Sequence, residues 1–291
     1  MPNPQSSIDV AVAQIATVPG DVAANLRKHL DVIDAARTAG SDVLVFPELS
    51  LTGHDAGRDA LGLALCRDAA QVADIAKASG PMCTVFGLVE EAPAAQFFNA
   101  AIAVRDGAIV AVHRKINLAT YGRLEDGKHF GAGGRVDPFD IAPLWRAGLL
   151  ICADLWNPPL VHLAALQGST LLLAPVSSAV EAVGDAFDNA TGWEVNVRFH
   201  ALTYGLPVAM ANRVGREGDL TFWGGSRIVD AFGRTLAQAA GADETLVRAP
   251  IAFDDVRRAR YLLPTLRDAN VPLLQRELTR IAATRVGAPT G

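Results

Sequence analysis

Residues Val43–Gly53 read VLVFPELSLTG, an apolar run that a proline ends just before Glu48. Four consecutive apolar residues predict a short buried strand, which places Glu48 at its carboxyl end. Upstream, the alternating run Ile8–Ile15 predicts another strand. Apolar residues at helical spacing within 22–33, preceded by Asp21 as an N-cap, predict an amphipathic helix between the two strands. This part of the chain therefore predicts an α/β protein.

The downstream sequence continues the alternation of helices and strands. A helix is predicted from about Arg58 to Ser79, and the Asp-Gly pair at 106–107 predicts a hairpin between two strand-like runs. Parallel and antiparallel pairing are therefore mixed. We predict one α/β domain over residues 1–263 and a C-terminal extension over 264–291. Further strands are predicted over 82–89, 98–104, 108–113, 148–152, 171–174, 208–212, 226–230 and 234–238, and further helices over 160–167 and 193–204.

Composition and charge exclude several classes of function. The chain has 291 residues, 50% of them hydrophobic and 20% charged, which is typical of a globular protein with a large core. Its net charge of −5 and the absence of basic runs argue against nucleic-acid binding. No apolar stretch reaches the length of a membrane span, and the N-terminal residues lack a basic and then apolar leader, so we expect a cytoplasmic protein.

The sequence shows no metal or cofactor motif. Three widely spaced cysteines form no CxxC pair, and the six histidines form no HxH or HExxH group, so we expect no metal. There is no Walker A loop and no G-x-S-x-G elbow, and the glycines of GAGG (131–134) do not fit G-x-G-x-x-G. We therefore expect no cofactor.

Three residues with complementary chemistry follow predicted strands. Cys152 ends an apolar run, Glu48 follows the strand quoted above, and Lys115 follows the strand over 108–113. The carboxyl ends of strands are where α/β proteins place their active sites. A thiol needs a base to become a nucleophile, and an acyl transition state needs a cation or a donor at its oxyanion. Together, these residues predict one catalytic cleft.

At these residues the sequence resembles the nitrilase, or carbon–nitrogen hydrolase, superfamily. The matching segments are, in order, VLVFPELSLTG around Glu48, HRKINL around Lys115, LLICADLWNP around Cys152, and NRVG with GGSRIVDAFG over 212–233. The resemblance implies a four-layer α-β-β-α sandwich of two mixed sheets. It also implies hydrolysis of a small-molecule amide to a carboxylate and ammonia through a Cys thioester.

The resemblance also implies a role for each site residue. Glu48 would be the general base, Lys115 the oxyanion stabiliser and Cys152 the nucleophile, with the backbone N–H of Ala153 completing the oxyanion hole. Many members carry a second acidic residue four positions before the Phe of the F-x-P-G segment. Counting back from the phenylalanine at position 130 gives Asp126, with Glu125 beside it, and which of the two acts stays open.

The region after the nucleophile is most similar to the glutaminase domain of glutamine-dependent NAD synthetases. Tyr121 and Trp156 occupy positions that line the glutamine pocket in that branch. The branch usually has Glu directly after the nucleophile, whereas this chain has Ala153. We therefore expect a stand-alone amidase that prefers a neutral amide to glutamine, unless the Asp154 carboxylate faces the cleft.

Several alternatives remain open at this level. The same three residues serve N-carbamoyl-amide hydrolases and nitrilases, and a binding or scaffold protein could keep the fold without catalysis. A Cys152–His200–Asn212 arrangement in the manner of papain-like proteases is a rival mechanism. A stripe of apolar residues at helical spacing over 273–281 predicts a homodimer, in line with the resemblance, with packing on the chain's own sandwich as the other interpretation.

Overall fold

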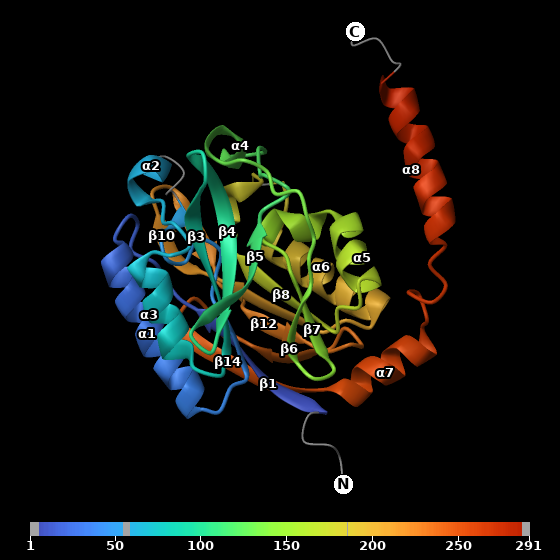
Figure 1. The fold of residues 1–291 in the computed structure, drawn as a ribbon, viewed down its shortest axis with the longest axis horizontal. Helices are drawn as coiled ribbons and strands as arrows, with labels where there is room; N and C mark the ends of the chain where they lie inside the picture. Colours follow the sequence, from blue (N-terminus) through green and yellow to red (C-terminus); the bar gives the residue numbers. More distant parts are fainter. Residues whose placement is uncertain (1–5, 55–58, 185, 287–291) are drawn as a thin grey trace.

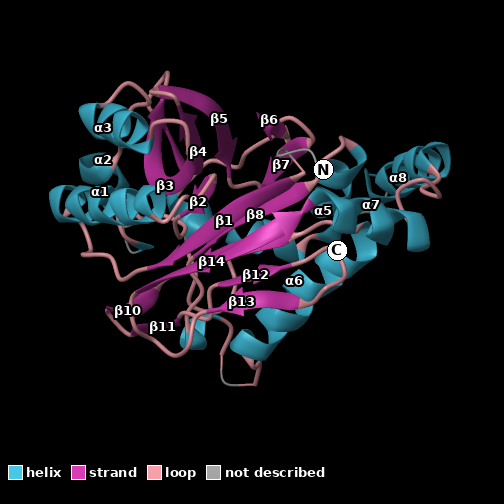
Figure 2. Ribbon diagram, turned by 90° about the horizontal axis from the view of Figure 1, so that it is seen from below, coloured by secondary structure: helices cyan, strands magenta, loops and turns pink. Residues whose placement is uncertain are grey.

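The computed structural model describes residues 6–54, 59–184 and 186–286. Two six-stranded sheets pack face to face, and helices cover the outer face of each (Figure 1, Figure 2). This is the four-layer α-β-β-α sandwich expected from the sequence. Among these residues, no helix is long and apolar enough to cross a membrane.

The first sheet has the strand order β14-β1-β2-β3-β4-β5. The β1–β2 and β2–β3 pairs are parallel, and the other three pairs are antiparallel. Helices α1 and α3 cover its outer face (Figure 1). The elements of this half are β1 (Ser7–Gln14), α1 (Val22–Thr38), β2 (Val43–Val45), α2 (Ala60–Leu63), α3 (Ala70–Ser79), β3 (Cys83–Ala92), β4 (Gln96–Arg105), β5 (Ala108–Arg114) and β14 (Thr245–Ala252).

The second sheet has the order β13-β12-β9-β8-β7-β6, with β7–β8 and β8–β9 parallel. Helices α5 and α6 cover its outer face (Figure 1). The remaining elements are α4 (Asp126–His129), β6 (Phe139–Ala142), β7 (Trp145–Leu149), the 3₁₀ helix η2 (Cys152–Trp156), α5 (Pro158–Leu166), β8 (Leu171–Val176), the 3₁₀ helix η3 (Val180–Ala182), α6 (Asn189–Tyr204), β9 (Val208–Asn212), the hairpin β10 (Val214–Glu217) and β11 (Leu220–Trp223), β12 (Arg227–Val229), β13 (Thr235–Gln238), α7 (Phe253–Leu262) and α8 (Val271–Val286).

The strands are apolar on both faces because each sheet lies between two layers. In β1, Val10 and Val12 pack into the core between the sheets, whereas Ala11 and Ala13 pack against the helices outside. Side chains alternate along a strand, so a continuous apolar run buries both of its faces. This explains why the strands of the sandwich read as apolar runs.

Two local predictions have different outcomes. The Asp-Gly hairpin is confirmed: Asp106 and Gly107 have φ angles of 51° and 76°, as a type I′ turn requires. The single helix from Arg58 to Ser79 is wrong, although Arg58 itself lies outside the described residues. Two helices, α2 and α3, stand there instead, because the Leu65 N–H donates to the Val89 carbonyl at 2.9 Å and makes the chain between them extended.

Helix α8 projects away from the sandwich (Figure 1), and the large apolar side chains of its stripe are exposed. Leu278 is 65% exposed and Ile281 41% exposed, and Leu273 and Leu274 are also exposed. In the structure, α8 therefore does not pack on the chain's own sandwich as the second interpretation of this stripe required. An uncovered stripe of this kind is typical of an interface.

We predict that α8 packs against a second copy of the chain. Light scattering at micromolar concentration should give a mass near twice 30.6 kDa, and Leu278→Arg should lower it because a buried guanidinium would lack a partner. Arg276→Glu, a charge change outside the stripe, is the control. A wild-type mass near 30.6 kDa would contradict the dimer.

Candidate active site

The site forms where the ends of four strands from both sheets meet. Glu48 follows β2 and Lys115 follows β5 in the first sheet, and Cys152 and Ser177 follow β7 and β8 in the second. The parallel pairing of β7 with β8 brings the last two to the same edge. The Glu48 N–H donates to the Val176 carbonyl at 3.3 Å and joins the two sheets at this edge.

Glu48 sits in a tight turn that needs a glycine beneath it. The next residue, Leu49, has a φ of 50°, a conformation that is unusual for a leucine and costs free energy. Its backbone lies directly over Gly87 of β3, where any Cβ would collide with the Leu49 nitrogen. The Leu51 N–H donates to the Gly87 carbonyl at 2.9 Å. The turn is thereby fixed against β3.

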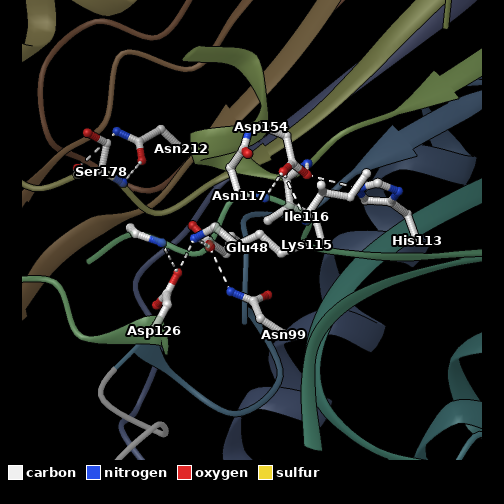
Figure 3. A network of polar contacts seen from close by, with 12 residues as sticks. Glu48, Asn99, His113, Lys115, Ile116, Asn117, Asp126, Asp154, Ser178 and Asn212 are labelled. Carbon is white, nitrogen blue, oxygen red and sulfur yellow. Dashed lines mark hydrogen bonds and ion pairs between the residues drawn. The ribbon is translucent and has the colours of Figure 1, made fainter. Parts of the chain in front are cut away.

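The two oxygens of the Glu48 carboxylate have different surroundings (Figure 3). Oε1 accepts hydrogen bonds from Asn99 Nδ2 at 2.8 Å and from Lys115 Nζ at 2.6 Å. Oε2 is buried, and no nitrogen or oxygen donor of the described residues contacts it. The side chain is therefore held by one oxygen, and the other remains able to take a proton.

Lys115 is held by its backbone as well as by its ammonium group. Its N–H donates to the Asn99 carbonyl at 2.9 Å, and its carbonyl accepts from the Gly133 N–H at 2.8 Å. A Cβ at Gly133 would collide with the Arg114 carbonyl, so only glycine fits there. This close approach is the structural role of the GAGG segment.

Asp126 is the second carboxylate on the lysine. Its Oδ2 accepts from Lys115 Nζ at 2.5 Å and from the Ala119 N–H at 3.2 Å, and the residue is buried. The neighbouring Glu125 side chain is 48% exposed and pairs with Lys128 on the surface at 2.5 Å. The structure thus brings Asp126 to the site and leaves Glu125 outside it.

The charges of Lys115 and Asp126 keep each other ionised. Burial by itself would lower the pKa of Lys115, but the Glu48 and Asp126 carboxylates outweigh it and raise that pKa well above its usual value. Burial likewise acts to raise the pKa of Asp126, and the Lys115 ammonium lowers it overall. The lysine is therefore a permanent cation at the floor of the site.

Cys152 lies at a sharp bend rather than within a strand. The predicted strand over 148–152 ends early, because β7 stops at Leu149 and Cys152 begins η2 with a φ of 45°. Burial and the Glu48 carboxylate raise the pKa of the Cys152 thiol well above its usual value, although Lys115 and a hydrogen bond from the Ser177 backbone oppose them. The resting thiol is protonated, so it needs a base. The N–H of Ala153, in the first turn of η2, has no acceptor within that helix.

Asp154 ties the cysteine bend to the segment that carries Lys115 (Figure 3). It is fully buried, and its Oδ1 accepts from the N–H groups of Ile116 and Asn117 at 3.0 and 2.7 Å. Its Oδ2 accepts from the Ile151 N–H at 3.0 Å and pairs with His113 Nε2 at 2.8 Å. All of these partners belong to the scaffold, so the carboxylate does not serve a substrate in the cleft.

We predict that Asp154→Asn lowers stability by about 3 kcal/mol and kcat by about tenfold. In either orientation, the NH₂ group of the new asparagine would face backbone N–H groups, and two donors cannot form a hydrogen bond. The link between the Cys152 bend and the segment that carries Lys115 would therefore loosen. Urea unfolding and steady-state kinetics measure the two effects. Asp140→Asn, which removes an exposed charge, is the control. Wild-type values for both variants would contradict the positioning role.

For the two adjacent acids, we predict that Asp126→Asn lowers kcat by at least about tenfold, because Lys115 loses one of its two carboxylates. Glu125→Gln should stay close to the wild type, since its partner lies on the surface. Steady-state kinetics on one substrate compare the two variants. A larger loss in Glu125→Gln would show that the roles are reversed.

A cavity of about 270 Å³ opens beside the thiol. Tyr121 and Trp156 line it, as the resemblance implies, together with residues that the sequence analysis did not place there. Burial raises the pKa of Tyr121 to about 12 and lowers that of His54, so both are neutral at pH 7. Among the described lining residues, Lys115 alone is charged. The full lining consists of His54, Lys115, Tyr121, Leu124, Cys152, Trp156, Ser177, Ser178, Ala182, Val183, Phe187, Asn189 and Trp193.

The papain-like alternative is wrong. His200 Nε2 donates to the Leu155 carbonyl at 2.8 Å, and Asn212 Oδ1 accepts from the Ser178 N–H at 2.8 Å. Both side chains therefore support the backbone around the site instead of activating Cys152. In the described ranges, no group of three or more His, Cys, Asp or Glu side chains could hold a metal ion.

The chain is similar to known proteins over most of its length. The family model of carbon-nitrogen hydrolases matches residues 9–261. The Pseudomonas protegens protein named "Hydrolase in pqqF 5'region" is 33% identical over 245 residues, 82% of this chain and 80% of that protein. The glutamine-dependent NAD(+) synthetase of Thermotoga maritima is 30% identical over 264 residues, 89% of this chain but 44% of the synthetase, so the chain spans less than half of that relative.

The fold is also found among solved structures. An amidase of the nitrilase superfamily from Nesterenkonia AN1 matches with a TM-score of 0.78 and 24% identity, over 94% of this chain and 98% of the amidase. The chain therefore belongs to the carbon–nitrogen hydrolase family of the nitrilase superfamily.

Proposed function

We propose that the enzyme hydrolyses small carboxamides to a carboxylate and ammonia through a thioester on Cys152. The observation that carries this proposal is the Glu48 carboxylate, whose Oε1 is held by two donors while the buried Oε2 has no nitrogen or oxygen partner among the described residues. The Glu48 carboxylate lies near enough to Cys152 to raise the pKa of its thiol, so it is suited to act as the general base for that thiol. The amidase from Nesterenkonia, with the same fold, is consistent with this chemistry.

In the first half-reaction, Glu48 takes the thiol proton as the sulfur attacks the amide carbonyl carbon. Negative charge then develops on the carbonyl oxygen, where the Lys115 ammonium and the Ala153 N–H would stabilise it. Glu48 returns the proton to the leaving nitrogen, and ammonia departs as the C–N bond breaks. The acyl group remains on Cys152 as a thioester.

In the second half-reaction, water hydrolyses the thioester. Glu48, now ionised again, takes a proton from the water, and the hydroxide attacks the thioester carbonyl. The C–S bond breaks and the sulfur leaves with a proton, which restores the resting enzyme and releases the carboxylate. Asp126 keeps Lys115 charged and oriented through both steps.

A screen for ammonia release tests this proposal. Purified enzyme is offered aliphatic and aryl carboxamides, N-carbamoyl compounds and nitriles, with Cys152→Ala as the control in every assay. Release of ammonia from the carboxamides alone supports the amidase assignment. Preferential turnover of N-carbamoyl compounds or nitriles would replace it with the corresponding activity, and no turnover of any class would favour a binding protein.

A further inference from the structure

The wall of the cavity next to the thiol contains one polar cluster outside the catalytic residues. It consists of Ser178, Asn189 and Trp193, which come from the end of β8 and from α6 and which all line the cavity. Ser178 and Asn189 are 5% and 7% exposed, so their polar groups have little access to bulk water. A buried polar group is costly unless it finds a partner.

The hydrogen bonds within this cluster fix how each group is oriented. Asn189 Nδ2 donates to Ser178 Oγ and to the Ala179 carbonyl, both at 2.7 Å. A carbonyl can only accept, so the nitrogen of the amide must face it, and the Oδ1 atom is left on the other side. No described donor reaches that oxygen. Asn189 therefore supplies one free acceptor.

Ser178, in contrast, has a hydrogen-bond donor that is not used within the cluster. Its Oγ accepts from Asn189 Nδ2 and from Trp193 Nε1, the latter at 2.9 Å, which uses both lone pairs of the hydroxyl oxygen. The hydroxyl hydrogen has no acceptor among the described residues. The Ser178 backbone is fixed as well, because its N–H donates to Asn212 Oδ1 at 2.8 Å (Figure 3). Ser178 therefore supplies one free donor on a rigid support.

Aromatic side chains lie beside this cluster in the cavity lining. The rings of Trp156 and Trp193 meet edge to face with centroids 5.3 Å apart, and Phe187 packs on Trp156 at 5.9 Å. None of these side chains can neutralise a charge. Among the described lining residues the one charged group is Lys115, and its ammonium already binds two carboxylates.

We propose that Ser178 and Asn189 recognise one uncharged group on the acyl part of the substrate that both donates and accepts a hydrogen bond, such as a hydroxyl or a second carboxamide. This inference rests on the proposed amidase function and narrows its substrate class. The aromatic side chains would contact the carbon skeleton, and the Ser178–Asn189 pair would bind the polar group. Substrates lacking that group would leave both partners unpaired in a dry pocket.

Matched amide pairs test the proposal. ω-Hydroxyalkanamides are compared with alkanamides of the same number of heavy atoms, and meta-hydroxybenzamide with meta-methylbenzamide. We expect the wild type to prefer the hydroxyl member of at least one pair by about tenfold in kcat/KM. The matched ω-aminoalkanamides, which are protonated at pH 7, should be the poorest substrates.

Substitutions of Ser178 and Asn189 test whether these two residues cause the preference for the hydroxyl substrate. In Ser178→Ala and in Asn189→Leu, the ratio of kcat/KM within the preferred pair should fall to about twofold or less. Asn196→Leu is the matched control: it lies on the same helix, its amide donates to the Leu155 carbonyl, and it does not line the cavity. That variant should keep the wild-type ratio. Circular dichroism checks the folding of each variant.

The outcomes separate this inference from the proposed function. Ammonia release with no preference in any wild-type pair would overturn the role of Ser178 and Asn189 while leaving the amidase intact. The same conclusion would follow if folded Ser178→Ala and Asn189→Leu both kept the preference. If no amide of either kind released ammonia, the proposed function itself would fail.

Discussion

Cys152→Ala should lower kcat for amide hydrolysis by at least about 10⁴-fold, and Glu48→Gln and Lys115→Ala should each come close to this loss. In the proposed mechanism the three groups act as one unit: the thiol is protonated at rest, the Glu48 oxygen without a described nitrogen or oxygen partner would take its proton, and Lys115 would stabilise the oxyanion. Ammonia release with a saturating amide measures the effect. Circular dichroism establishes that the variants are folded.

Two further variants test whether the loss of activity is specific to the three proposed catalytic residues. Cys66→Ala, which removes an exposed cysteine that does not line the cavity, should leave kcat unchanged. His200→Ala should also retain most of its turnover, since that ring supports a backbone carbonyl. If His200→Ala were as inactive as Cys152→Ala while Glu48→Gln kept substantial activity, the assignment of the base would be wrong.

The second large effect concerns substrate preference. The kcat/KM for a neutral amide should exceed the kcat/KM for glutamine by at least about 100-fold. Glutamine brings an ammonium and a carboxylate, and burying either without a partner costs several kcal/mol, each 1.36 kcal/mol being worth about a factor of ten. Ala153 offers no counter-charge. The Asp154 carboxylate is engaged with the scaffold through both oxygens, and Asp154 does not line the cavity.

Side-by-side kinetics on glutamine and on simple aliphatic and aryl carboxamides decide this point. The synthetase relative from Thermotoga maritima makes glutamine the natural rival substrate. A variant with a carboxylate directly after the nucleophile, Ala153→Glu, serves as a matched comparison and should move the preference toward glutamine. A clear preference of the wild type for glutamine would refute the argument from Ala153 and Asp154.

Much of the site was visible in the sequence, but its supporting residues were not. Glu48, Lys115 and Cys152 stand out because each follows an apolar strand, and strand periodicity is a local property. Asn99, which holds Glu48, carried a weaker signal as the one polar residue within the apolar part of β4. Asn189 carried none, since an asparagine near a helix start usually serves as a cap.

The sequence by itself determined an α/β fold with mixed strand pairing and the strand-end positions of Glu48, Lys115 and Cys152, which follow from the order of residues within short windows. The four layers of the sandwich came from the resemblance to the nitrilase superfamily. Only the tertiary structure decided that Asp126 rather than Glu125 contacts Lys115, that Asp154 turns into the scaffold, and that Leu65 interrupts the predicted helix. These outcomes depend on partners that are distant in the sequence. A shift of one residue would exchange the buried Asp126 carboxylate for the exposed Glu125 carboxylate, while the local sequence pattern would stay nearly the same.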